Sequence, residues 1–342
     1  MGQDTLSDVL KNIRLRGAAF YDVLCGDRWV AEAPPAREVA AAVMPGLEHV
    51  IEYHVVVRGA CWASVVGGEA VRLTAGDVVM FAQGDAHVMS SEPGMRAPPR
   101  DVGWVFASRD DPKPIPVRYE LDARFGNGDG SAEHAATRLV CGFFGCDLRP
   151  FNPLVATLPR LLRLPAAAGN GWVAGVLQQA IAESRKHRAG GEAMLERISE
   201  MIFVDAVRRH VDSLPAQSTG WLAGLSDRFV GRALSLLHAT PARDWTGETL
   251  ASEVGLSRSA LHERFAHLVG MPPMQYLANW RMQVAAGLLR TTPANVASIA
   301  LDVGYDSEAA FARAFKRATG APPATWRRAA GAKTAAAAVA TA

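Results

Sequence analysis

The sequence has few cysteines and lacks a long apolar segment. Its 342 residues include four cysteines, Cys25, Cys61, Cys141 and Cys146. This number is too small for a disulfide framework, and we expect reduced thiols. No run of about 18 uncharged apolar residues occurs, and the N-terminal stretch has scattered charges without an apolar core, so neither a membrane span nor a signal peptide is predicted. We therefore expect a cytoplasmic protein.

The net charge is also small. A formal charge of +2 says little about partners, because a nearly neutral protein can still carry one basic face. The chain is 49% hydrophobic and 20% charged, which favours folded structure over disorder. A length of 342 residues favours two or more domains.

Short strand patterns dominate the first part of the chain. The stretches HVIEYHVVVRG, CWASVVGG, EAVRLTAGD, VVMFAQGD and AHVMSS are rich in Val and aromatic residues and are interrupted by Gly or Asp. This pattern is typical of an all-β sandwich or barrel. The segment DPKPIPVRYELDARFGNGDGS predicts an excursion ending in a flexible loop, and TRLVCGFFGCDL predicts a further strand. We place the first domain at residues 1–150.

The hydrophobic period then changes from two residues to about 3.6. NPLVATLPRLLRL, GWVAGVLQQAIAESRKHRA and GEAMLERISEMIFVDAVRRHVDSL predict amphipathic helices, and we assign residues 151–215 to a helical dimerisation or connecting region. The apolar stripe of the last helix fits either packing against the β domain or a dimer seam. Its members are Leu195, Ile198, Ile202, Ala206 and Val211. Residues 216–227 predict a linker, and the low-complexity tail 331–342 is predicted to be disordered.

A helix-turn-helix pattern occurs twice in the last hundred residues. In the first copy Thr246 can cap a short helix, Gly255 can supply the positive φ that ends it, and Ser257 can cap a second helix. In the second copy Gly304 and Ser307 take the same places, with Gly304 lying 49 residues after Gly255. An ordinary helical bundle is the alternative, but a duplication at this spacing disfavours it.

One long helix is predicted between the two copies, roughly from Pro273 to Leu289. At ~1.5 Å per residue it would span about 25 Å. With the width of the flanking helices added, two recognition helices could stand about one DNA turn, roughly 34 Å, apart on one face of a duplex. We therefore predict a double helix-turn-helix DNA-binding domain over residues 228–330.

The exposed faces of the two recognition helices hold the candidate DNA contacts. Short residues at a helix start allow close approach to base edges, Arg can bond guanine, and Lys or Arg can meet phosphate. Residues 241–330 contain 10 Lys or Arg against 7 Asp or Glu, a modest basic bias. The candidates are Arg258, Ser259, His262 and Arg264 on the first helix and Glu308, Ala309, Ala312, Arg313, Lys316 and Arg317 on the second.

Residues 228–328 resemble the C-terminal domain of AraC/XylS-type transcription regulators. IALDVGYDSEAAFARAFKRATGAPPATWR is close to the signature of that family over the second unit. The resemblance implies double-stranded promoter DNA as the partner, RNA polymerase as a further partner, a homodimer, and activation more often than repression.

The N-terminal half resembles the cupin-type sensor domains of one branch of these regulators. GDVVMFAQGDAHVM resembles the second cupin motif, and EYHVVVRGACW resembles the start of the first motif without the paired histidines and the glutamate of metal-dependent cupin enzymes. The resemblance implies an α+β multidomain chain, in which a cupin-like β-barrel with an internal effector pocket is followed by middle helices and an all-α domain with two helix-turn-helix motifs.

His54 and His87 are candidate ligands for an effector or a metal, and Cys25 and Cys141 join them because VLCGDRW and RLVCGFFGC also resemble the sensor domains. Two thiols and two imidazoles would suit Zn²⁺. Alternatively, exposed thiolates could respond to oxidants. A structural role is the simpler interpretation, since strand histidines are usually satisfied core residues and buried cysteines behave as small hydrophobes.

We therefore expect a transcription regulator that senses a small molecule, a metal or an oxidant, and not an enzyme. One alternative is a cupin-type metal-dependent enzyme with an appended DNA-binding domain. It requires a third or fourth metal ligand near His54 and His87, because strand spacing supplies only two. A second alternative is an architectural DNA binder whose barrel only dimerises.

Overall fold

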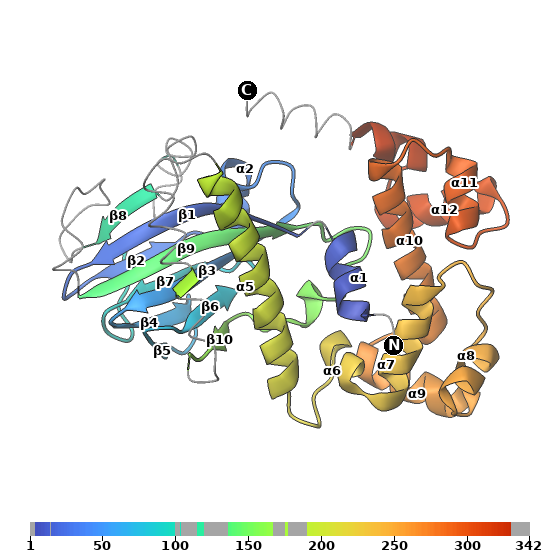
Figure 1. Cartoon of the computed structure of the whole chain (residues 1–342), viewed down its shortest axis with the longest axis horizontal. Coiled ribbons are helices and arrows are strands. Elements are labelled where there is room, and N and C mark those ends of the chain that lie inside the picture. Colours follow the sequence, from blue (N-terminus) through green and yellow to red (C-terminus); the bar gives the residue numbers. More distant parts are fainter. Residues whose placement is uncertain are drawn as a thin grey trace. The chain divides into compact units, whose positions relative to one another are not determined.

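The computed structural model shows two compact units (Figure 1). The sheet unit comprises residues 15–146 and 158–210, and the helical unit comprises residues 1–14, 147–157 and 211–342. The residues that the structure describes are 4–13, 15–99, 103, 115–119, 136–166, 175–176 and 190–329. In this part of the chain no helix is long and apolar enough to cross a membrane.

The sheet unit is a sandwich of two hydrogen-bonded sheets. The larger sheet has the order β10-β6-β3-β9-β1-β8, and the smaller has the order β2-β7-β4-β5. The described strands form no closed barrel, which corrects the barrel expected from the sequence. All ladders are antiparallel except that of β1 with β8. The elements are β1 (Arg16–Cys25), β2 (Val30–Ala33), α2 (Ala36–Val43), β3 (His49–Arg58), β4 (Ala60–Val65), β5 (Val71–Thr74), β6 (Val78–Phe81), β7 (His87–Ser90), β8 (Ile115–Tyr119), β9 (Thr137–Cys146), β10 (Leu162–Leu164) and α5 (Gly191–Ser213).

The central strands β3 and β9 are buried almost throughout, because both faces of the larger sheet are covered. One face meets the smaller sheet. The other meets α5, where Tyr53 Oη lies 2.7 Å from Ser199 Oγ and the ring of Phe144 lies 5.1 Å from that of Phe203. Strand β4 of the smaller sheet instead alternates buried and half-buried residues.

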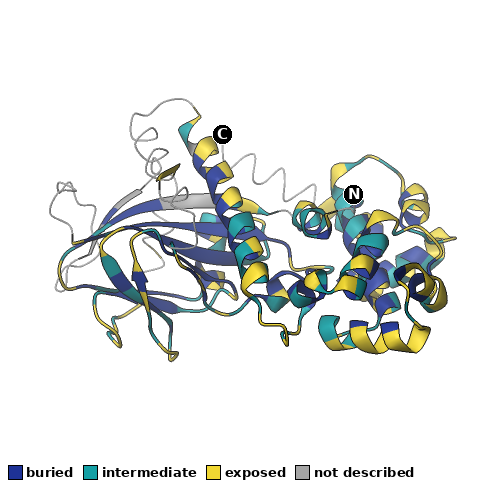
Figure 2. Cartoon of the chain, turned by 60° about the horizontal axis from the view of Figure 1, so that its bottom comes forward, coloured by how far each residue is buried: buried dark blue, intermediate teal, exposed yellow. Residues whose placement is uncertain are grey.

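Helix α5 is buried on the side that faces the sheet and exposed on the other side (Figure 2). Leu195, Ile198, Ile202 and Ala206 of the predicted stripe are buried. Packing against the β domain is therefore confirmed for this stripe. The predicted helix over NPLVATLPRLLRL is wrong: this segment forms a 3-10 turn at Val155–Thr157 and the edge strand β10. Most of GWVAGVLQQAIAESRKHRA and the whole tail 331–342 lie outside the described residues.

The helical unit contains both helix-turn-helix pairs on a long central helix. Its elements are α1 (Thr5–Asn12), α6 (Trp221–Ser226), α7 (Arg228–Ala239), α8 (Gly247–Val254), α9 (Arg258–Val269), α10 (Pro273–Thr291), α11 (Val296–Asp302) and α12 (Glu308–Thr319). The expected linker 216–227 contains α6 instead. Trp221 of this helix is buried, and its indole N–H donates a hydrogen bond of 2.8 Å to Tyr276 Oη of α10. A buried indole N–H needs such a partner.

Gln283 in α10 connects three segments of the helical unit. Its side chain is fully buried; its amide nitrogen donates to the carbonyl of Asn12 at 2.7 Å, and its amide oxygen accepts from the N–H of Phe151 at 3.0 Å. Near the end of α10, Arg290 lies 3.5 Å from Asp147 in a little-exposed ion pair. Residues 1–14 and 147–157 therefore belong with the helices, whereas the sequence placed residues 1–150 in one domain.

Candidate DNA interface and sensor site

The first helix-turn-helix pair consists of α8 and α9. The hydroxyl of Thr246 accepts from the N–H of Thr249 in a capping box, and Gly255 ends α8 in the left-handed conformation with φ 79°. Ser257 then caps α9. Leu261 and Phe265 are buried and fix which side of α9 faces outward.

The second pair, α11 and α12, repeats these devices. Asn295 caps α11, Gly304 follows it with φ 81°, and Ser307 caps α12. Phe311 and Phe315 are buried against α10 and α11 in one core cluster. The predicted turns and caps are thus confirmed, and the additional cap at Asn295 follows the same rule.

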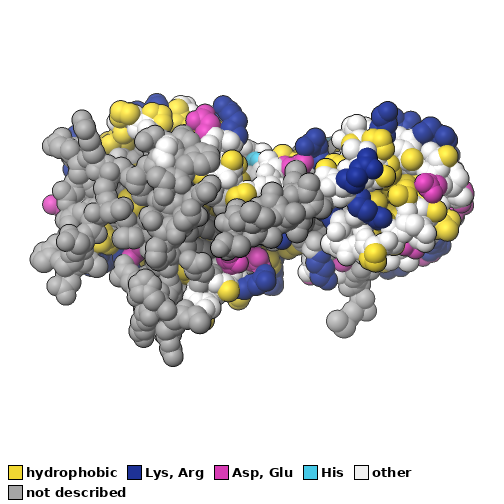
Figure 3. All heavy atoms as spheres, turned by 90° about the horizontal axis from the view of Figure 1, so that it is seen from above, with side chains coloured by type: hydrophobic (Ala, Val, Ile, Leu, Met, Phe, Trp, Pro, Cys, Tyr) yellow, Lys and Arg dark blue, Asp and Glu magenta, His cyan; other side chains and the backbone are white. Residues whose placement is uncertain are grey.

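The candidate DNA contacts lie on the outward faces of α9 and α12. All ten are exposed except Ala312, which is half-buried. Lys and Arg side chains gather in groups on the surface of the helical unit (Figure 3). These faces combine short side chains near the helix starts with long basic ones further on, which suits a close approach to bases with phosphates at the sides.

The basic candidates differ in their partners. Arg258 forms an ion pair of 2.7 Å with Glu248, and Arg264 binds the carboxylate of Asp227. Among the described residues Arg313, Lys316 and Arg317 form no salt bridge, so their charges are available to a ligand. The structure therefore favours α12 over α9 as the source of free cations.

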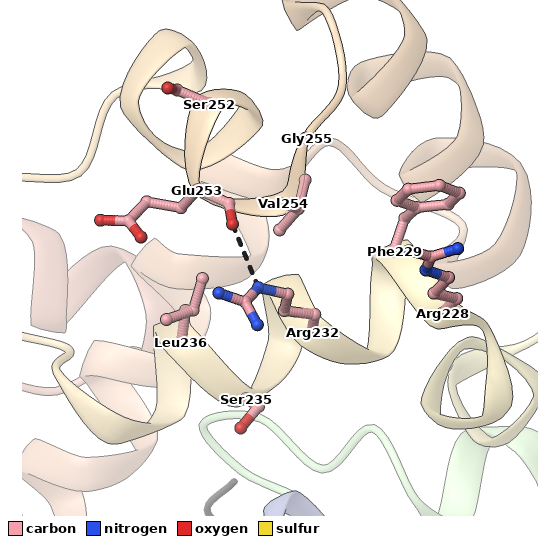
Figure 4. A pocket seen from close by; sticks show the side chains of 9 residues that line it. All are labelled: Arg228, Phe229, Arg232, Ser235, Leu236, Ser252, Glu253, Val254 and Gly255. Atoms are coloured by element: carbon pink, nitrogen blue, oxygen red, sulfur yellow. Dashed lines mark hydrogen bonds between the residues drawn. The ribbon is translucent and has the colours of Figure 1, made fainter.

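A surface pocket of about 720 Å³ lies between α7 and α8 (Figure 4). Arg232 from α7 reaches across it and donates a hydrogen bond of 3.1 Å to the carbonyl of Glu253. This carbonyl is in the last turn of α8, where helical partners are missing. The Glu253 side chain in turn pairs with Arg243 at 3.0 Å. These contacts brace the first helix-turn-helix pair against α7.

A polar cluster lies inside the apolar sandwich of the sheet unit. Glu52 and His54 are two residues apart on β3, so both point to the same face as the core residues Val50 and Val56. His87 begins β7 in the other sheet, and its Nε2 lies 2.9 Å from Nε2 of His54. Glu52, His54 and His87 are only 4%, 3% and 1% exposed.

The second nitrogen of each imidazole is held as well. Nδ1 of His87 lies 3.1 Å from the carbonyl oxygen of Asp85, which can only accept, so this nitrogen carries a proton. Nδ1 of His54 lies 2.8 Å from Sγ of Cys141 on the neighbouring strand β9. Phe81 stacks on the His87 ring with centroids 3.7 Å apart. Both rings are therefore fixed in orientation.

Glu52 was missed by the sequence analysis. Its carboxylate oxygens lie 3.9 Å from Nε2 of His54 and 3.8 Å from Nε2 of His87. One ligand atom from each of the three residues lies within 4.8 Å of the others. The signal was present as a Glu-x-His spacing, which places both side chains on one face of a strand.

The structure brings Cys141 into this cluster, but no described hydrogen bond joins Cys25 to it. Cys25 is fully buried, and burial raises the pKa of its thiol well above the usual value, with smaller contributions from Cys141 and Cys61. Burial also raises the pKa of Cys61 to about 12. The thiolate is the reactive form, so burial opposes reaction with oxidants at these two residues. None of the four cysteines forms a disulfide.

The paired helix-turn-helix units and the cupin sandwich define the chain as a DNA-binding transcription regulator. Residues 4–212 match a family described as Cupin, and residues 250–329 match one described as Helix-turn-helix domain. A putative AraC-like transcription regulator of Streptomyces lividans is 33% identical over 327 residues, which cover 95% of this chain and 98% of the relative. The chain belongs to the AraC family.

More distant relatives also match over most of their length. The HTH-type transcriptional regulator AlkR of Acinetobacter baylyi is 27% identical, with 92% of this chain and 95% of the relative covered. The RCS-specific HTH-type transcriptional activator RclR of Escherichia coli is 25% identical, with 81% and 84% covered. Among solved structures, the DNA-binding domain of AdpA in complex with a target DNA is 30% identical, covering 32% of this chain and 96% of that chain with a TM-score of 0.30.

Proposed function

We propose that this regulator binds promoter DNA with α9 and α12 and activates transcription in response to an effector held in the sheet unit. The observation that carries the proposal is the duplicated pair of capped recognition helices, whose apolar sides are buried and whose basic sides are exposed. Two such helices in one chain can enter successive major grooves. RNA polymerase is the partner through which activation would occur, in the cytoplasm.

The effector is a small molecule, a metal ion or an oxidant. The buried cluster of His54, His87 and Cys141 supports a site for it, because imidazole nitrogens and a thiol are the side-chain groups that most often bind a metal ion. The free Cys25 thiol belongs to the same interior. An effector changes DNA binding only if it binds one arrangement of the protein more tightly than another.

A homodimer is part of the proposal. The outer side of α5 exposes Met194 and Met201 at 48% and 55%. Large exposed apolar side chains on one helix suit a contact with a second copy. Sedimentation velocity of the full chain measures this directly, and a monomer across the micromolar range would remove the dimer.

Footprinting on the neighbouring promoter tests the function. We expect the full-length protein to protect two major-groove segments on one face of the duplex, roughly one turn apart. Addition of Zn²⁺ or of an oxidant should change the protection or the transcript level. Equal binding to every duplex at all salt concentrations would contradict a promoter-specific regulator.

A metal-dependent enzyme with an appended DNA-binding domain is the second candidate. Glu52 favours it, because two histidines and one carboxylate are a common set of ligands in catalytic metal sites. Turnover of a substrate by the metal-loaded chain, in the absence of DNA, would establish this activity.

A further inference from the structure

The two helix-turn-helix units share α10, and each packs on its own half of that helix. Phe265 of α9 meets Tyr276 in the first half, with ring centroids 5.7 Å apart. Phe311 of α12 belongs to one core cluster with Met282 and Leu289 of the second half. A shared helix fixes the distance between the units along its axis. It fixes their relative orientation less well, since long helices bend gently along their length.

Arg281 lies between the two halves of α10 and binds the loop that leads into the first unit. Its Nε donates to the carbonyl oxygen of Pro241 at 2.8 Å, and its Nη2 donates to that of Arg243 at 3.0 Å. Both carbonyls belong to the loop of residues 240–246, between α7 and α8. A guanidinium holds its N–H donors in a rigid planar fork, so these two bonds fix the orientation of the loop as well as its place.

This loop is in turn attached to the first unit. The guanidinium of Arg243 pairs with Glu253 of α8 at 3.0 Å and lies 4.0 Å from the centroid of the Trp245 ring. Trp245 is buried, and its indole N–H donates to the carbonyl of Thr240 at 3.1 Å. A movement of the loop would therefore move the first helix-turn-helix unit with it.

The turn of the second unit lies against the same loop. A Cβ atom placed on Gly304 would come within 2.8 Å of the Ala242 carbonyl oxygen and 2.7 Å of Nη2 of Arg281. The ring of Tyr305, the next residue, has its centroid 5.9 Å from the Arg281 guanidinium. The loop 240–246, Arg281 and Gly304 thus form one junction, which connects the two units in addition to their packing on α10.

The corresponding turn of the first unit is not packed in this way. Gly255 has nearly the same conformation, with φ 79° against 81° for Gly304. Among the described residues, however, no atom lies within 4 Å of a Cβ placed on Gly255. Positive φ accounts for a glycine in both turns. The close approach of Gly304 to Ala242 therefore has a cause other than the turn itself.

We propose that Arg281 and Gly304 are positioning residues for DNA binding, and that their junction sets the spacing and the relative angle of α9 and α12. Two recognition helices enter successive major grooves only at a matching separation and rotation about the duplex axis. Holding both units in that arrangement before binding lowers the entropic cost of association. The inference rests on the proposed function for its DNA partner, whereas the rigidity of the junction is a property of the chain alone.

The first test measures this rigidity without DNA, in the full-length chain. Spin labels are attached through Ser259→Cys and Ala309→Cys, at corresponding exposed positions near the starts of α9 and α12. The four native cysteines are buried, and the chain without the two substitutions serves as the labelling blank. Pulsed electron paramagnetic resonance should give one narrow distribution of label-to-label distances. The distribution should broaden when Arg281→Gln is added.

Arg327→Gln is the matched control. The Arg327 side chain is half-buried like that of Arg281 and also donates to two backbone carbonyls, those of Leu289 at 3.1 Å and Ala294 at 2.5 Å. These carbonyls lie in the second half of α10 and in the segment that follows it, so the variant loses similar bonds without opening the junction. Its distance distribution should stay narrow. Equal widths in Arg281→Gln and Arg327→Gln overturn the proposal.

The second test uses the full-length chain on two promoter duplexes, one with the native spacing and one with a base pair inserted between the two protected segments. The insertion turns one segment by about 35° relative to the other. The wild type should bind the native spacing at least ~10-fold more tightly. Gly304→Ala should reduce this ratio several-fold, whereas Gly255→Ala, with the same strain of positive φ, should keep it. Partial unfolding lowers both affinities by the same factor, so the ratio reports the arrangement of the helices and not stability.

The outcomes separate this inference from the proposed function. A wild-type ratio near 1, or equal ratios in Gly304→Ala and Gly255→Ala, overturns the positioning role while promoter binding stands. If the wild type protects no promoter segment, the proposed function fails. The distances between the spin labels still decide in that case whether the junction holds the two helices in one arrangement.

Discussion

Arg264 on α9 binds the carboxylate of Asp227, which also caps the start of α7. Nε of Arg264 lies 3.0 Å from both carboxylate oxygens, and the N–H groups of Phe229 and Val230 donate to the same carboxylate at 3.0 and 2.9 Å. The Arg264 side chain, which holds the pKa of Asp227 below its usual value, thus has a structural partner. It connects the first recognition helix to the helix behind it.

We expect Arg264→Ala to reduce stability more than DNA recognition. Loss of this partly exposed ion pair should lower the free energy of unfolding by about 1 kcal/mol. Asp227→Ser removes the pair but keeps a capping oxygen, so it should cost a similar amount, whereas Asp227→Ala should cost about 2 kcal/mol. Urea unfolding of the four proteins checks this order. A large loss of promoter affinity in Arg264→Ala with unchanged stability would instead show that Arg264 contacts DNA.

Arg313 and Lys316 on α12 should act differently on DNA. Arg313→Ala should weaken specific binding by roughly 1–3 kcal/mol and relax the preference at one base pair. Lys316→Ala should weaken binding to all sequences alike. It should also reduce the slope of log K against log salt concentration by about 1, because one phosphate contact is lost. Titrations of specific and random duplexes at several salt concentrations separate the two. Equal affinity of Arg313→Ala and wild type for the promoter would exclude a base contact.

His238 should make the stability of the helical unit depend on pH. The ring stacks on Trp280 with centroids 3.9 Å apart, and burial lowers its pKa to about 3. Between pH 6.5 and about 3 the unfolded chain binds a proton that the folded chain does not, so stability falls as pH falls through this window. The loss from pH 7 to pH 5 should be about 2 kcal/mol.

The variants that test His238 are compared by the slope of their free energy of unfolding against pH. Replacement of a stacked ring also changes the absolute free energy of unfolding, so absolute values are not compared. His238→Gln should lose this part of the pH dependence, and the exposed His262→Gln should keep it. Urea unfolding at pH 7 and pH 5 measures the difference. The same slope in His238→Gln and wild type would show that folding does not lower the pKa of His238.

Gln283→Leu should destabilise the helical unit by about 2 to 4 kcal/mol. The change preserves the size of the side chain but leaves the carbonyl of Asn12 and the N–H of Phe151 without their partner. The control is Gln275→Leu, at an exposed position of the same helix, with an expected effect within about 0.5 kcal/mol. If both variants unfold alike in urea, Gln283 does not hold these segments in solution.

The helical repeat could be predicted from the sequence because its signals are local. Thr246, Ser257 and Ser307 are caps, and Gly255 and Gly304 adopt the positive φ that the turns require. Each of these residues acts within one helical turn, so the residue and the helix end that it determines lie in the same short stretch of sequence. The strands of the sandwich were found for a similar reason, since alternation is local too.

The partners of side chains across the fold could not be predicted. Arg264 and Asp227 are 37 positions apart, and Gln283 and Asn12 are 271 apart. Only the packed fold decides that these groups meet. The pairing of Glu52 with His87 belongs to the same class, because it depends on two strands of different sheets. The helix predicted at residues 152–164 is wrong, because this segment forms a 3-10 turn and the edge strand β10. The spacing of its apolar residues alone does not distinguish these elements from a short helix.

The buried Gln283 has a consequence for how such regulators can be recombined. The helical unit is assembled from three separate stretches of chain, so the polypeptide leaves and re-enters it between its first residues and its last. A C-terminal fragment cut out for expression, or grafted onto another sensor, would lose α1 and the stretch 147–157, and the buried Gln283 side chain would lose both of its backbone partners. A functional transplant must carry those two short stretches along with it.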